Sequence, residues 1–286
     1  DVKTDVKMQV VRNDEGSPSS GSSAVAAMVG LGLGMVLYMF LMIYGAMVMQ
    51  SVIEEKSSRV LEVVVSSVRP FELMMGKIFG VASVAVVQVL IWAVLVCGAG
   101  AAVMPHVLPD GAMEAAAALQ QGGGAATAAA GDFDPETLGA IALATDVGYL
   151  AMLFGYLLLF VVGGYLLYSA MFAAVGSAVD NAQDAAQLQT PIMIPIILAV
   201  IVEMSVLNDP NSPLAFWFSL IPFTSPVVMM ARIPYGIPTW EIVLSLVLLY
   251  AAFVGMVWLS AKIYRVGIFM YGKKPTLREM FRWIRY

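Results

Sequence analysis

Few residues of this chain have the types and spacing that catalysis requires. The sequence holds one histidine, His106, and one cysteine, Cys97. His106 follows an apolar run in a turn with prolines, without a second histidine or a nearby cysteine, so it lacks the partners of a zinc site. A single cysteine excludes an internal disulfide. There is also no paired nucleophile and base, so proteolysis within a membrane has no visible machinery. We therefore expect no catalytic residue, no metal site and no enzyme activity in this chain.

The sequence also lacks the glycine-rich loop that usually binds the phosphates of a nucleotide. Gly76-Lys77 is followed by Ile78 and is not preceded by the rest of a G-x-x-x-x-G-K-[ST] pattern, whose backbone amides hold phosphates. The chain is therefore not expected to bind ATP by itself in the usual way, and we expect no cofactor.

Two charges lie in otherwise apolar surroundings. Glu203 is placed near the outer end of a predicted span, and Arg232 lies in a proline-rich apolar stretch after it. An ionisable residue inside a span is a functional hypothesis by default. We hypothesise that both line or gate the exit of a translocation path, and the alternative is that both anchor the chain at the membrane interface.

The charged stretch 53–70 separates two very apolar segments. Placed on a helix, it puts apolar residues on one side and polar residues on the other. The apolar side holds Ile53, Val60, Leu61, Val64, Val65 and Val68, and the polar side holds Glu55, Ser58, Arg59, Glu62, Ser66 and Arg69. Glu55 and Arg59 are spaced i, i+4 in the favourable order for an ion pair. The pattern favours a short amphipathic helix on a membrane face, and the alternative is an ordinary solvated loop.

The same stretch carries a family resemblance. EEKSSRVLEVVVSSVRPFELMMGKIFG, residues 54–80, resembles the segment after the second span of type-2 ABC exporter permeases, closest to the sodium-efflux-like branch. The run from Pro222 to Pro234, PFTSPVVMMARIP, resembles a second family feature near the last span. The resemblance implies that 53–70 is the coupling helix that touches a separate ATPase subunit. The residues it assigns to that contact are Glu54, Glu55, Lys56, Arg59 and Glu62.

The resemblance also implies the partners. ATP and Mg²⁺ are expected on an ABC ATPase subunit, and a second permease half, identical or different, is expected to pair with this chain in the lipid bilayer. No dense acid cluster in the spans supports a cation path. Nucleic-acid binding is a poor alternative for a basic tail beside a membrane.

Composition sets the class and charge sets the orientation. The chain has 286 residues, 60% hydrophobic and 12% charged, against about 25% charged in globular domains, so it is an integral membrane protein. Of 15 Lys and Arg residues, four lie in 54–77 and seven in 262–286, whereas 104–146 has six acids and no Lys or Arg. The positive-inside rule places 51–71 and the C-terminus in the cytoplasm and 104–146 outside.

The apolar segments predict an all-α, polytopic helical bundle in the cell (inner) membrane. The expected spans are 24–50, 72–103, 147–178, 191–207 and 239–263, since about 20 apolar residues cross a bilayer. Further expectations are the coupling helix 53–70, an outer re-entrant helical hairpin at 210–238 and a basic cytoplasmic tail at 264–286. The polar stretch 1–23 is interpreted as the tail of an extracytoplasmic domain followed by a linker, because in the resembled family a first span and such a domain precede this point.

The resemblance implies that residues 24–263 are the permease domain of an ATP-driven exporter, and this is the function we expect. An ion-gradient-driven secondary transporter or channel is the first alternative, and a membrane scaffold that transports nothing is the second. The coupling-helix resemblance favours the ATP-driven exporter over these two alternatives.

The charge asymmetry gives a topology test. With Cys97 removed, single cysteines at Gly123 and Thr276 should react with an impermeant thiol reagent from opposite sides of the membrane, because the loop 105–145 is predicted outside and the tail inside. Labelling of both cysteines from the same side would contradict the five-span topology.

Overall fold

The computed structural model describes residues 20–58, 69–108, 111–120, 135–270 and 277–283, and over them the chain is almost wholly helical. Within these residues, five helices are long and apolar enough to cross a membrane. They are α1 (Ser20–Ser57), α3 (Pro70–Val107), α7 (Val147–Ala178), α8 (Ala182–Val206) and α11 (Thr239–Gly267). The shorter elements are α4 (Ala112–Gln120), α6 (Pro135–Thr145), α9 (Pro213–Leu220), α10 (Ser225–Arg232), the 3₁₀ turn η1 (Ile233–Tyr235) and α12 (Leu277–Trp283). The predicted all-α bundle with five spanning helices is confirmed.

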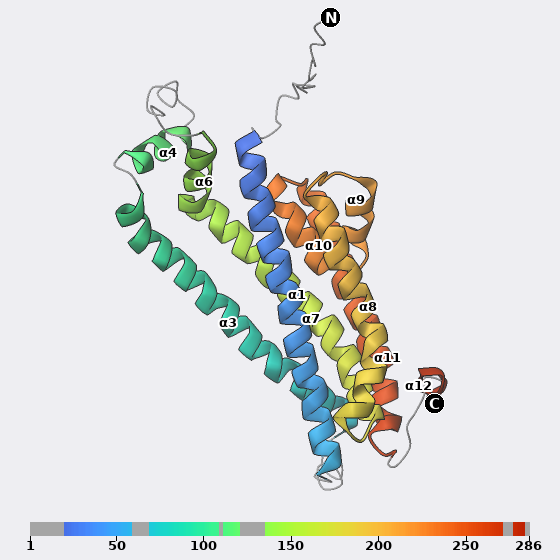
Figure 1. Ribbon diagram of the computed structural model, residues 1–286. Coiled ribbons are helices and arrows are strands. Elements are labelled where there is room, and N and C mark those ends of the chain that lie inside the picture. The colour runs from blue at the N-terminus through green and yellow to red at the C-terminus, as the bar shows by residue number, and fades with distance from the viewer. Residues whose placement is uncertain (1–19, 59–68, 109–110, 121–134, 271–276, 284–286) are drawn as a thin grey trace, which may run out of the picture.

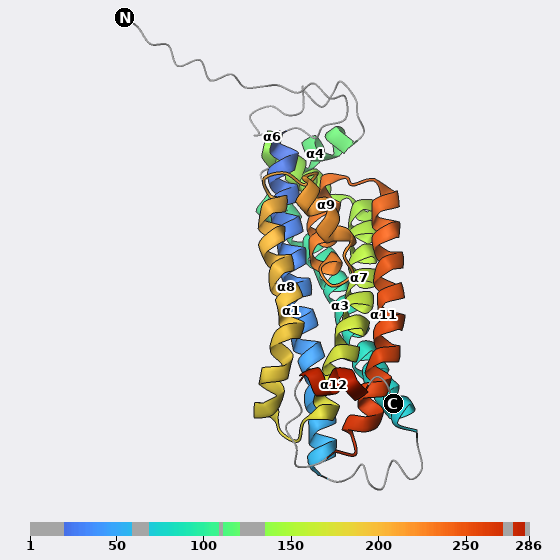
Figure 2. The same cartoon turned by 90° about the vertical axis from the view of Figure 1, so that its right-hand side faces the viewer.

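The bundle is built around α7, the most buried of the five spans. Helix α1 packs along one side of α7 and α11 along another, while α3 leans away from α1 towards α4 and α6 (Figure 1). Helices α1, α7 and α11 finish at one end of the bundle, where α3 begins and α12 lies; we call this the α12 end (Figure 2). The opposite end carries α4, α6, α9 and α10, and we call it the α10 end.

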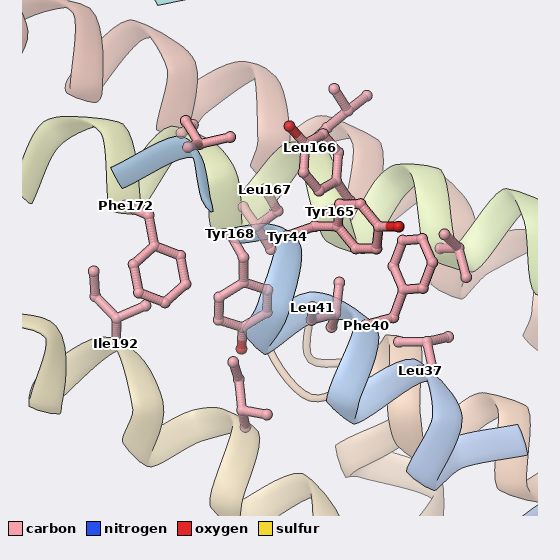
Figure 3. Packing of buried hydrophobic residues seen from close by; sticks show 14 of the residues in the cluster. Leu37, Phe40, Leu41, Tyr44, Tyr165, Leu166, Leu167, Tyr168, Phe172 and Ile192 are labelled. Carbon is pink, nitrogen blue, oxygen red and sulfur yellow. The ribbon is translucent and has the colours of Figure 1, made fainter. Parts of the chain in front are cut away.

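The core between α1 and α7 combines large apolar side chains with tyrosines. Leu37, Phe40, Leu41 and Tyr44 of α1 face a run on α7 from Tyr165 to Phe172, with Ile192 of α8 beside them (Figure 3). Two tyrosine hydroxyls of α7 find backbone carbonyls elsewhere: Tyr165 donates to Ile78 O at 2.9 Å, and Tyr168 to Phe223 O at 2.5 Å. Each ring therefore fills the core while its hydroxyl fixes a neighbouring element in place.

Two glycines of α1 bring it close to the elements near the α10 end. A Cβ on Gly30 would lie against the Ala231 carbonyl of α10, 3.2 Å from its carbon and closer still to its oxygen, and a Cβ on Gly34 would lie 2.7 Å from Glu203 Cδ of α8. The G-x-x-x-G spacing thus makes a close helix contact. In this chain the contact is internal, so the Gly30–Gly34 side of α1 is already covered.

The first spanning helix is longer than expected. Helix α1 continues to Ser57, so residues 53–57 are its last turns and do not begin a separate helix. The reason is burial: Val52 and Ile53 are at most 4% exposed, and Lys56 is fully buried. The rest of the predicted coupling helix, 59–68, lies outside the described residues, and α3 begins at Pro70, two residues before the predicted span.

The fourth span also begins earlier, at Ala182 instead of at 191, so the loop expected over most of 179–190 is wrong. Asn181 caps the helix by accepting a hydrogen bond from the Asp184 backbone N–H at 2.9 Å. Pro191 and Pro195 then lie inside α8, not at its beginning. Leu188, Ile192 and Ile196 keep one face of the helix buried across both prolines, and this packing holds the helix continuous.

The proline-rich stretch 210–238 forms a pair of short helices, α9 and α10, and their depth in a membrane stays a prediction. The segment 105–146 contains α4 and α6. The domain tail and linker predicted within 1–23 fall almost entirely outside the described residues.

Candidate functional site

At the α12 end, one buried lysine joins three helices. Lys56, in the last turn of α1, is 0% exposed. Its ammonium group donates to Ser177 O at 2.8 Å and to Gly267 O at 3.0 Å, and it lies 3.1 Å from Asp180 Oδ1. The ammonium group therefore donates to two carbonyls, and its charge is balanced by one carboxylate.

The two carbonyls lie at the C-terminal ends of α7 and α11. Carbonyls in the last turn of a helix have no partner within the helix, and the helix dipole makes them more negative. Lys56 donates to Ser177 O and also to Gly267 O, which accepts a second hydrogen bond from the Met270 N–H at 3.1 Å. The arrangement ties the end of α1 to the ends of α7 and α11.

Small residues make room for this lysine. A Cβ on Gly267 would lie 3.0 Å from Ser177 O, and a Cβ on Gly176 would lie 2.7 Å from Met49 O. A larger side chain at either position would separate the helix ends that Lys56 joins. We call Lys56, Ser177, Asp180 and Gly267 the Lys56 anchor.

A second lysine ties α3 to the same place. Lys77 donates to Ser51 O at 2.8 Å and pairs with Glu55 Oε2 at 2.8 Å, and its side chain is only 10% exposed. The ion pair predicted for Glu55 was with Arg59, which lies outside the described residues; the structure gives Glu55 a partner on α3 instead. The E-E-K and G-K ends of the 54–80 motif are thus side by side in space.

The predicted ATPase-contact residues therefore divide into groups. Glu54 is exposed and accepts a hydrogen bond from Gln50 Nε2 at 3.2 Å. Glu55 is partly exposed and paired, whereas Lys56 is buried inside the bundle and does not face outward. Arg59 and Glu62 lie outside the described residues.

At the α10 end, Arg232 is the centre of a second buried polar cluster. It is 1% exposed, donates from Nε to Pro210 O at 2.8 Å and from a terminal nitrogen to Ser219 Oγ at 2.6 Å, and pairs with Glu241 Oε2 at 2.9 Å. Ser245 adds a hydrogen bond to Ser219 O at 2.7 Å. Arg232 thereby joins α9, α10 and α11 through side chains that are all inside the protein.

Glu203 differs from Arg232 in having no such partners. It is 0% exposed, against Gly34 of α1, and neither carboxyl oxygen has a hydrogen-bond partner among the described residues. Arg232 pairs with Glu241 and not with Glu203. The two residues predicted for a translocation path are therefore both buried, but they do not form one charged pair.

Sequence reasoning missed three residues of these clusters. Asp180, Lys77 and Glu241 each pair with a charge on a different helix. In the sequence, each of the three is a charged residue within a few residues of a span end. A charge in that position is explained equally well by anchoring at the membrane interface.

Five helices long and apolar enough to cross a membrane, within the described residues, indicate a multi-pass membrane protein. The family model described as "ABC-2 family transporter protein" matches residues 3–262. The chain therefore belongs to the ABC-2 family of transporter membrane proteins, the membrane permease class of ABC transporters. The finer likeness to the sodium-efflux-like branch stays a prediction.

Two relatives are similar over most of the chain. One is the "Uncharacterized protein YhaP" of Bacillus subtilis, 27% identical over 251 residues, which cover 87% of this chain and 53% of the relative. Another is the "Uncharacterized protein MJ1024" of Methanocaldococcus jannaschii, 27% identical over 260 residues, covering 90% and 54%. The chain thus spans about half the length of these relatives. No solved structure matches it.

The contrast between Glu203 and Arg232 gives a test of their roles. Glu203→Gln should keep or raise the thermal midpoint of the purified protein, because it removes a buried group that is costly to ionise without a partner. Arg232→Gln should destabilise by about 3–5 kcal/mol, because it leaves the buried Glu241 carboxylate unpaired. Thermal unfolding in detergent measures both effects.

Export by the same variants separates structure from transport. If Glu203→Gln folds normally and export falls, Glu203 acts in transport. Unchanged export would leave it a core residue. A normal midpoint for Arg232→Gln would contradict the account of the Arg232 cluster.

Proposed function

We propose that this chain is the transmembrane permease part of an ATP-driven exporter. In this proposal it forms the substrate pathway, a separate ABC ATPase binds at the α12 end, and that end faces the cytoplasm of a cell membrane. ATP and Mg²⁺ are held by the ATPase, and a second permease half, identical or different, completes the pathway. Membership of the ABC-2 family supports the proposal.

The observation that carries the proposal is a pair of lysines, Lys56 buried within the 53–70 segment and Lys77 largely buried just after it. Lys56 fastens the α1 end of the segment to α7 and α11, and Lys77 fastens the start of α3 to the end of α1. A partner that displaces this segment therefore pulls directly on four spanning helices. A loosely attached loop would absorb the same displacement.

The division of the contact residues fits this role. Glu54 is exposed and available to a partner, and Arg59 and Glu62 belong to the segment itself. Lys56 acts behind the surface, holding the segment to the bundle. We therefore assign partner contact to Glu54, Arg59 and Glu62, and transmission to Lys56, Glu55 and Lys77.

The ion-gradient alternative has one observation in its favour, the buried carboxyl group of Glu203 without a partner. Intramembrane acids of this kind occur in proton relays. Transport that persists without ATP, collapses with the proton gradient and disappears in Glu203→Gln would favour this alternative. A scaffold would transport under neither condition.

The ATPase contact is tested by charge reversal in the full-length protein, co-expressed with its ABC ATPase. Arg59→Glu should reduce co-purification of the ATPase by about tenfold or more, because a complementary charge becomes a repulsive one. Arg282→Glu is the matched control, since Arg282 is an exposed cation of α12 at the same end. Full binding and full transport with both Arg59→Glu and Glu54→Lys would contradict the contact.

Transmission is tested by Lys56→Met. The variant should still bind the ATPase, because Lys56 does not face outward, but the ratio of substrate-stimulated to basal ATP hydrolysis should fall towards one. Asp180→Asn should have a smaller effect, since both carbonyl acceptors of Lys56 remain. Full stimulation by the Lys56→Met protein would contradict a transmitting role while leaving the ATPase contact intact.

A further inference from the structure

A hollow opens on the side of the bundle at the α12 end, between the start of α3 and the last turns of α11. Its volume is about 750 Å³. Three cations line it, Arg69, Lys262 and Arg265, together with apolar side chains that include Phe71, Val254 and Trp258. Neither the Lys56 anchor nor the Arg232 cluster contributes to it.

The charge in this hollow is of one sign. No carboxylate is among the residues that line it. Lys262 Nζ lies 4.4 Å from the centre of the Trp258 ring, a cation–π contact that leaves the positive charge in place. Arg265 is exposed and has no ion pair among the described residues. Such a surface is complementary to an anion.

The apolar wall faces sideways, where the hydrocarbon of a bilayer surrounds a spanning helix. Val254 is 66% exposed, Trp258 60% and Phe71 48%. From Arg265 to Val254 is 11 residues of α11, or about 16 Å along the helix. Half of a hydrocarbon core of about 30 Å has nearly this thickness. The hollow therefore joins headgroup-level cations to an apolar surface one leaflet deep.

We propose that this hollow binds an anionic phospholipid from the leaflet at the α12 end. The phosphate lies among Arg69, Lys262 and Arg265, and an acyl chain follows α11 past Trp258 towards Val254. Guanidinium and ammonium groups are the usual partners of lipid phosphates in basic pockets between spanning helices. Trp258 lies seven residues, or about 10 Å, along α11 from Arg265, where its ring lines the acyl-chain part of the hollow.

Charge complementarity and shape together favour a lipid over other occupants. A soluble anion would use the cations and leave the apolar wall uncovered. A second copy of the chain would cover the apolar wall but would have to supply acids opposite three cations. The inference requires only that α11 crosses the membrane, so it stands or falls separately from the ATP-driven mechanism.

The test is native mass spectrometry of the full-length protein in detergent, with equal amounts of dioleoylphosphatidylglycerol and dioleoylphosphatidylcholine. The wild-type protein should retain phosphatidylglycerol in preference. Arg265→Gln should weaken this retention about fivefold, since a cation near a lipid surface contributes about 1 kcal/mol. Arg282→Gln, which removes an exposed cation of α12 outside the hollow, should leave retention unchanged. Lys262→Gln provides a second variant within the hollow.

Several outcomes would overturn the proposal. Equal retention of the two lipids, or equal losses in Arg265→Gln and Arg282→Gln, would remove the site. Displacement of phosphatidylglycerol by millimolar inorganic phosphate would assign the cations to a soluble anion. A disulfide between two copies carrying Val254→Cys in membranes would assign the hollow to a contact between copies.

Discussion

The α12 end of this structure depends on the buried ammonium group of Lys56. A charge inside a helical bundle is costly unless every donor is satisfied and an opposite charge is near. The structure meets this requirement with two backbone carbonyls at the ends of α7 and α11 and with the Asp180 carboxylate. Removing the ammonium group would take away the contacts that join α1 to both of these helix ends. The three helix ends are therefore expected to stay together when the bundle moves.

The α10 end uses a cation in the same way. Arg232 donates hydrogen bonds to the Pro210 carbonyl and the Ser219 hydroxyl and pairs with the Glu241 carboxylate. It holds two short helices, α9 and α10, whose eight residues each leave few hydrogen bonds within the helix. Glu203 stands apart because it is equally buried and has no such set of partners. Both side chains are buried, so burial does not distinguish them. The presence of partners marks Arg232 as structural, and their absence among the described residues leaves Glu203 as the candidate for a part in transport.

The sequence alone was sufficient to predict the five spanning helices, but not the residues at which they begin and end. Apolar length predicted five spanning helices, because crossing a membrane requires about 20 apolar residues whatever the neighbours are. The ends depend on tertiary contacts instead. Helix α1 reaches Ser57 because Lys56 finds acceptors 121 and 211 residues away, and no local pattern reveals those distances. Likewise, the two prolines suggested a later start for the fourth span. Helix α8 instead begins after the Asn181 cap, and its buried face keeps it helical across both prolines. For Glu55, the local i, i+4 rule suggested Arg59, while the described structure supplied Lys77 on another helix.

These contacts also explain why the two ends of one sequence motif should act as a unit. In residues 54–80 the glutamates and lysine at the start and the lysine near the finish are adjacent through the Glu55–Lys77 pair. In the proposed coupling, force applied between the two ends of this motif would reach α1 and α3 together, because the Glu55–Lys77 pair joins these helices. Lys56 would then pass that force from α1 to α7 and α11. Pro70 and Phe71 at the start of α3 line the hollow beside α11. A lipid held there would be in contact with the first turn of α3 and the last turns of α11, two of the helix ends that the proposed ATPase would move.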